Sequence, residues 1–125
     1  MWNWIHRWGS PPEFYGMSGR ILPWFAVLTV LLFAIGLPWA LVIAPEDYQQ
    51  GNSVRIMYIH VPAAILAQSS YFIMAMAGAI FLIWRIKIAD VAMASAAPIG
   101  ASLTLLAILS GALWGKPTWG TYWVW

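Results

Sequence analysis

The chain has 125 residues, of which 62% are hydrophobic and 8% are charged, and it carries a formal net charge of +2. Soluble domains carry about 25% charged residues, so this composition excludes an ordinary water-facing surface and predicts a membrane protein. The lack of cysteine excludes disulfides and thiolate metal sites, and the small charge without a basic cluster does not indicate a nucleic-acid partner.

The chain opens with an aromatic segment, residues 1–20, whose tryptophans and Arg7 suit the headgroup zone of a membrane. We expect this segment to be cytoplasmic or interfacial, and we assign no chemistry to His6. Residues 21–44 follow without a charge, and about 20 apolar residues suffice to cross a ~30 Å hydrocarbon core as a helix. A cleaved signal peptide would have a shorter apolar run and fewer residues before it, so we predict an uncleaved membrane helix.

The middle of the chain holds the second predicted membrane helix, residues 61–84, which is also uncharged. The segment 45–60 before it forms a predicted outward loop that ends at His60, and Pro62 is placed near the first turn of the helix. Gln68 lies within this helix, where an amide is costly unless it faces another helix or a cavity. We therefore expect it to join helices.

The third predicted membrane helix, residues 91–115, follows a short turn at 85–90. It carries small residues at four-residue spacing, which allow helices to approach closely: Ala92, Ala96 and Gly100. We favour a general packing surface over a specific partner interface. The last residues, 116–125, contain glycine, lysine and proline, which favour a re-entrant or surface-lying segment over a continued helix.

The positions of lysine and arginine predict how these helices are oriented. More of them flank the ends expected in the cytoplasm than the outward ends: Arg7, Arg20, Arg85 and Lys87 against Arg55 and Lys116. The N-terminus is therefore predicted to be cytoplasmic, and the tryptophan-rich end outside. Other tryptophans near the span ends suit the aromatic belts of a membrane: Trp24, Trp39, Trp84 and Trp114. The sequence predicts an all-α integral membrane protein with three transmembrane helices.

His60 is the strongest candidate for chemistry, because a neutral imidazole at the mouth of a helix can ligate a metal or haem iron or relay a proton. On residue type alone, a hydrogen bond to a loop carbonyl is the commoner role. The adjacent Glu46 and Asp47 are typical of a solvated loop. Serines within the spans have no histidine neighbour in the sequence: Ser69, Ser70 and Ser110. No catalytic set is predicted, and we do not expect an enzyme.

Tryptophans gather at the end of the chain, with glycines between them: Trp114, Trp119, Trp123 and Trp125. They predict an aromatic shelf at the outer membrane surface. Such a shelf either anchors the segment at the headgroup level or provides a platform for a large planar ligand, with acidic edges near Arg55 or Lys116. The residues alone leave both roles open.

Two stretches resemble a known family. The run WGKPTWGTYWVW resembles the tryptophan-rich "WWD" signature of the haem-handling proteins of cytochrome c maturation, and PEDYQQGNSVRIMYIHVPAA is similar to the first outward loop of its haem exporters. The resemblance covers essentially the whole chain. It implies a non-enzymatic protein of the bacterial inner membrane that holds haem b at the periplasmic face and passes it to a haem chaperone, working with an ABC-type complex.

The resemblance also assigns roles to residues. His60 would be an axial ligand to the haem iron, and the tryptophans of the shelf would line the haem platform: Trp114, Trp119, Trp123 and Trp125. From its charge and position, we add that Arg55 meets a haem propionate through charge-assisted hydrogen bonds.

The chain departs from the family pattern at its end. In the family the signature continues with an aspartate, three further spans and a second ligating histidine, which this sequence does not contain. We therefore expect the first half of a six-span bundle, belonging to a longer protein. One histidine and half of a platform are expected to bind haem weakly.

Two other functions are considered. A structural membrane subunit of an ABC-type transporter complex would use its tryptophans only as anchors, associate through the small-residue face of residues 92–100, and bind no chromophore. A haem–cytochrome c ligase of the same superfamily is less well supported, because the N-terminal part is short and the histidine lies in the context HVPAA.

Overall fold

The computed structural model of the protein describes residues 10–124. Within this range the fold is all-α, as predicted, and no strand is formed apart from an isolated bridge between Asp47 and Gly51. The elements are α2 (Pro11–Pro38), the π-helix η1 (Trp39–Ile43), α3 (Val54–Trp84) and α4 (Lys87–Trp119). Three helical segments are long and apolar enough to cross a membrane, the first of them made by α2 and η1 together. His6, Arg7 and Trp125 lie outside the described residues.

The helix α2 begins upstream of the predicted span 21–44. Pro11 and Pro12 suit its first positions, because the N–H that proline lacks has no helical partner there, and Glu13 suits the positive N-terminal end of the helix dipole. The sequence prediction counted only the uncharged run, whereas the helix includes the more polar turns before it. After Pro38 the helix widens into η1, where the N–H of Ala44 donates to the carbonyl of Trp39 at 2.8 Å.

The helix α3 begins at Val54, so the loop before it is shorter than the predicted segment 45–60. His60 and Pro62 consequently lie within α3, and the placement of Pro62 near the first turn was wrong. The helix α3 begins before the predicted start at Val61, and Arg55 lies in its first turn, where its guanidinium donates to backbone carbonyls at the end of η1.

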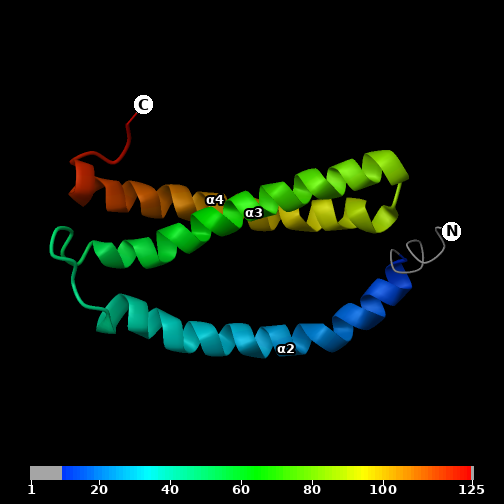
Figure 1. Cartoon of the computed structure of the whole chain (residues 1–125), viewed down its shortest axis with the longest axis horizontal. Helices are drawn as coiled ribbons and strands as arrows, with labels where there is room; N and C mark the ends of the chain where they lie inside the picture. Colours follow the sequence, from blue (N-terminus) through cyan, green and yellow to red (C-terminus); the bar gives the residue numbers. More distant parts are fainter. Residues whose placement is uncertain (1–9, 125) are drawn as a thin grey trace.

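A tight turn joins α3 to α4. Arg85 adopts a left-handed conformation with φ of 54°, and its N–H donates to the carbonyl of Phe81 at 2.8 Å. Ile86 precedes α4, which begins at Lys87, so the turn is shorter than the predicted 85–90. The two helices therefore form an antiparallel hairpin (Figure 1).

The helix α4 continues through Lys116 and Pro117 to Trp119, which corrects the expectation that the chain leaves the helix after residue 115. Pro117 removes only one backbone donor near the end of the helix, and Gly120 is the residue that stops it. Gly120 has a φ of 79°, which side chains disfavour, and its N–H donates to the carbonyl of Lys116 at 3.0 Å.

Small residues fill the interface between α3 and α4. The buried positions are Ala63, Ala67, Ser70 and Ala77 on α3, and Ala89, Gly100 and Ser110 on α4. A Cβ atom at Gly100 would lie 3.0 Å from Cβ of Ser70, so the helix backbones are close there. Of the predicted small-residue face, Gly100 is buried, Ala96 is half-buried and Ala92 is exposed.

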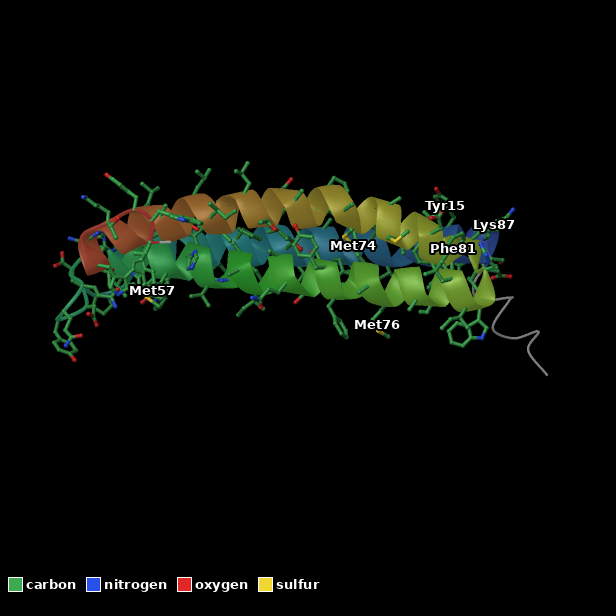
Figure 2. The ribbon with its side chains drawn as sticks, turned by 90° about the horizontal axis from the view of Figure 1, so that it is seen from above. Tyr15, Met57, Met74, Met76, Phe81 and Lys87 are labelled. Atoms are coloured by element: carbon green, nitrogen blue, oxygen red, sulfur yellow. The ribbon has the colours of Figure 1, made fainter. Side chains whose placement is uncertain are left out.

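The helix α2 lies along one side of this hairpin and buries none of its residues (Figure 1). The π-helix η1, which continues α2, contacts α3. Figure 2 shows Tyr15 of α2 at the same end as Phe81 and Lys87 of the hairpin turn, with Met57 at the opposite end. The loop before α3 and the tryptophan-rich segment share that opposite end (Figure 1). His60 and Trp114 are in contact there.

Candidate functional site

A cavity lies where α4 ends and the following segment folds back. Its volume is about 390 Å³, within the range of ligand pockets in proteins. Gly115 allows this return, because a Cβ atom there would meet the carbonyl oxygen of Thr121 at 3.3 Å and Cε3 of Trp119 at 3.4 Å. The lining is largely apolar and aromatic: His60, Ala107, Ile108, Gly111, Ala112, Gly115, Trp119, Thr121, Tyr122, Trp123 and Val124.

The imidazole of His60 is held against α4 by one of its two nitrogens. Nδ1 lies 3.0 Å from the carbonyl oxygen of Ala107 and 3.2 Å from Oγ of Ser110. A carbonyl can only accept a hydrogen bond, so Nδ1 carries the proton and donates. In the neutral ring Nε2 then carries the lone pair, and it makes none of the side-chain hydrogen bonds found among residues 10–124. The nitrogen that can bind a metal belongs to a side chain in the cavity wall.

Gly111 brings the ring and the helix backbone close together. A Cβ atom on Gly111 would lie 2.7 Å from Cε1 of His60, which is closer than real Cβ contacts. The absence of a side chain at this position therefore creates the space that the imidazole occupies.

Three of the four tryptophans predicted for the shelf meet at this end of the molecule. Trp114 stacks on the His60 ring, with centroids 6.1 Å apart and planes at 27°, and meets Trp119 edge-on at 5.0 Å. Trp119 and Trp123 line the cavity and are exposed, whereas Trp114 is half-buried and is not among the lining residues. Trp125 lies outside the described residues.

The loop before α3 supports Trp114. Its indole Nε1 donates to Oε1 of Gln50 at 2.9 Å. Asp47, expected to be a solvated surface residue, is half-buried and accepts the backbone N–H groups of Gln49 and Gln50 at 2.9 and 2.8 Å. The neighbouring Glu46 is exposed. The carboxylate of Asp47 thereby orders the turn that presents Gln50 to the indole.

Arg55 is not among the residues that line the cavity. Its Nη2 donates to the carbonyls of Val42 and Ala44 at 3.3 and 3.1 Å, which ties α3 to the end of η1. Its Nε is buried and has no hydrogen-bond partner among the described residues. Lys116 is closer to the cavity: Nζ lies 5.2 Å from the ring centroid of Tyr122, a lining residue, and donates to the carbonyl of Gly120 at 3.0 Å.

Gln68, expected to face another helix or a cavity, makes no side-chain hydrogen bond to α4 among the described residues. It is exposed, whereas its neighbour Ala67 is buried, because adjacent residues of a helix point about 100° apart. Tyr71 of the same predicted face does reach across, since Oγ1 of Thr104 donates to its hydroxyl at 3.2 Å.

Ser110 and Gly111 were missed as site residues by the sequence analysis. Ser110 was set aside because no histidine is near it in sequence, yet the hairpin places it against His60. The position of the turn in the sequence could have indicated that Ser110 and Gly111 lie close to His60. Residues at equal distances before and after Arg85–Ile86 meet across an antiparallel hairpin, and His60 and Gly111 are such a pair.

Comparison with known proteins identifies close relatives. The family model described as "Heme exporter protein C" matches residues 4–125. Proteins named "Heme exporter protein C" are 50% identical over 125 residues in Haemophilus influenzae and 48% identical over 125 residues in Escherichia coli K12, covering all of this chain and 51% of each relative. The relative from Bradyrhizobium diazoefficiens is 52% identical over 116 residues, which are 93% of this chain and 44% of that protein. The chain thus spans about half the length of the curated relatives it matches.

Proposed function

Because the chain belongs to the heme exporter protein C family, we propose that it binds haem b at the tryptophan-lined cavity and delivers it for cytochrome c maturation. The observation that carries this proposal is the hydrogen bonding of the His60 imidazole. Its Nδ1–H is used by α4, which leaves the lone pair of Nε2 for the iron at the wall of an apolar, aromatic cavity.

The donor set fits iron within a porphyrin better than a bare metal ion. A bare ion of the zinc type takes three or four protein ligands, whereas the porphyrin supplies four nitrogens and leaves only axial positions to the protein. Among residues 10–124 there is no group of three or more histidine, cysteine, aspartate or glutamate side chains that could hold a metal ion. A single histidine beside an aromatic wall suits the porphyrin.

The aromatic residues give the platform its chemistry. The exposed rings of Trp119 and Trp123 offer flat apolar surfaces on which a macrocycle can stack, and aromatic pairs add about 0.5–1.5 kcal/mol beyond area burial. Trp114 does not line the cavity, but it stacks on His60 and contacts Trp119 edge-on. We keep Trp125 in the platform from the family resemblance.

The propionates of haem require a cation near the cavity. Arg55 was expected to supply it, but the structure directs its Nη2 to backbone carbonyls. Lys116 contacts a ring of the cavity wall, and we propose it as the nearer propionate partner. Arg55 remains the second candidate for this contact.

The setting we propose is the bacterial inner membrane, crossed by three helices of this chain, with the N-terminus in the cytoplasm. The cavity then lies at the periplasmic face. Haem is the cargo: His60 holds it and the tryptophans orient it, and the proposed partners are a periplasmic haem chaperone and ABC-type subunits. No step in this account breaks or forms a covalent bond, so the proposed role is not enzymatic.

An absorption spectrum tests the proposal. The full-length protein, purified in mild detergent from haem-replete cells, is expected to show a Soret band that is lost or strongly weakened by His60→Ala. His6→Ala is the matched control, because it removes the other histidine of this sequence, and it should leave the band unchanged. A band of equal strength in all three proteins would overturn the assignment of His60, and no band in any would favour a structural membrane subunit.

A further inference from the structure

We propose that Ser110 and Gly111 of α4 are positioning residues that form a seat for the His60 imidazole and set its strength as a ligand. This inference rests on the proposed haem function and extends it to residues that do not ligate the iron themselves. The seat consists of the carbonyl of Ala107, the hydroxyl of Ser110 and the space left by Gly111.

Ser110 acts on His60 through a directed chain of hydrogen bonds. Its hydroxyl donates to the carbonyl of Leu106 at 2.6 Å, which leaves the lone pairs of Oγ to accept from Nδ1–H of His60 at 3.2 Å. Ser110 is only 7% exposed, so these bonds form away from water. An acceptor at Nδ1–H increases electron density on the imidazole and fixes its orientation, as the outer partners of ligating histidines do.

Gly111 provides the shape of the seat. The ring is held at a distance from α4 that a single methyl group would prevent, since the added Cβ would lie 2.7 Å from Cε1, 3.2 Å from Nδ1 and 3.5 Å from Nε2. The atoms that would be displaced are the far end of a side chain, not backbone. A methyl group at this position therefore moves the imidazole while the helices can stay in place.

The imidazole ring of His60 is held from two sides. Its outer flank stacks on Trp114, and its Nδ1 is fixed to α4, so the ring has little freedom to rotate. Both contacts come from the C-terminal half of α4, which also supplies the cavity wall. The same helix thus positions the ligand and the platform.

The first variant, Ser110→Ala, removes one acceptor and leaves the carbonyl of Ala107. Because loss of an outer partner typically weakens a metal site by about 10–100-fold, we expect haem affinity to fall roughly tenfold. The reduction potential of the bound haem should rise, because a less electron-rich imidazole stabilises the ferric iron less. Ser70→Ala is the matched control: Ser70 is also buried between α3 and α4 and donates to Leu66 four residues back, but it does not contact His60. It should change neither quantity.

The second variant, Gly111→Ala, displaces the ring instead of removing a partner. We expect a weakened and shifted Soret band with helix content unchanged in circular dichroism. Gly78→Ala is the control on the same hairpin, because its Cβ would meet Sδ of Met93 at an ordinary 3.5 Å.

The results separate this inference from the function on which it rests. If His60→Ala abolishes the Soret band while Ser110→Ala and Gly111→Ala keep the affinity, band position and potential of the parent, the seat is wrong and the haem site stands. If His60→Ala retains the band, both fail. The seat is supported when Ser110→Ala and Gly111→Ala alter the haem while Ser70→Ala and Gly78→Ala do not.

Discussion

Single side chains at the end of the molecule that carries His60 hold the site together. Gln50 binds the indole of Trp114, Trp114 stacks on His60, and α4 binds the other side of the imidazole. Each contact limits the freedom of the next group. If haem binds as proposed, the ligand is positioned beforehand, which lowers the entropy lost on binding.

The two cations considered as propionate partners, Arg55 and Lys116, are expected to behave differently when they are replaced. Arg55→Gln should destabilise the protein by about 2 kcal/mol, because hydrogen bonds from a charged group to the carbonyls of Val42 and Ala44 are lost. It should leave the preference for haem over haem dimethyl ester unchanged. Lys116→Gln should do the reverse and reduce that preference, because the ester has no carboxylates to bind.

The measurement is a titration of each variant with haem and with its dimethyl ester, alongside unfolding in mixed micelles. A preference lost in Arg55→Gln and kept in Lys116→Gln would restore Arg55 as the propionate partner.

At the scale of elements, the hairpin of α3 and α4 is the packed part of the described chain, and α2 stands beside it. The hairpin depends on small residues, because larger ones would separate the backbones. The helix α2 buries none of its residues, so its apolar side chains are left exposed by the hairpin.

Gly100→Val tests the hairpin packing. The added side chain would meet Ser70 at 3.0 Å or less, and overpacking of this kind costs about 1–3 kcal/mol. Gly36→Ala on α2 is the control, because nothing lies within 4 Å of its Cβ position. Unfolding in mixed detergent micelles, followed by circular dichroism, should show earlier unfolding for Gly100→Val only. Equal midpoints for the parent and Gly100→Val would mean that the helices are not packed closely there.

The helices themselves could be predicted from the sequence, because long apolar runs without charge have few alternatives in a membrane. Their ends could not. Arg55 lies inside α3 since its charge finds carbonyl partners, and α4 passes Pro117 and stops only at Gly120. Helix ends depend on which local partners satisfy a charge or a backbone group, and these partners come from other segments.

For the molecule as a whole, the arrangement places the predicted ligand and its platform at one end. His60 and the tryptophans were predicted from residue type and resemblance, and three of the four tryptophans gather near His60. Ser110 and Gly111 were not predicted, because their contact with His60 arises from the pairing of α3 with α4. A single sequence predicts which residues of two helices meet only if the residues that form the turn between them are known.

The proposed orientation can be tested with single cysteines, because this chain contains none. Tyr48→Cys replaces a side chain that is 91% exposed in the loop before α3, and Lys87→Cys lies at the opposite end, after the hairpin turn. In intact spheroplasts a membrane-impermeant maleimide should label Tyr48→Cys at once and Lys87→Cys only after lysis. The parent protein controls for other thiols. Labelling of Lys87→Cys in intact spheroplasts would reverse the orientation.

The most direct test of the central claim, that the Nε2 lone pair of His60 binds haem iron at the cavity, is imidazole rescue of His60→Gly. The full-length variant should lose the Soret band of the parent, because the ligand is gone while the tryptophan platform remains. Imidazole added together with haem to the variant should fill the space of the missing ring and restore the parent spectrum. 1,2-Dimethylimidazole should not, because its methyl group crowds the iron. A spectrum that imidazole leaves unchanged, or a His60→Gly variant that already matches the parent, would contradict the claim.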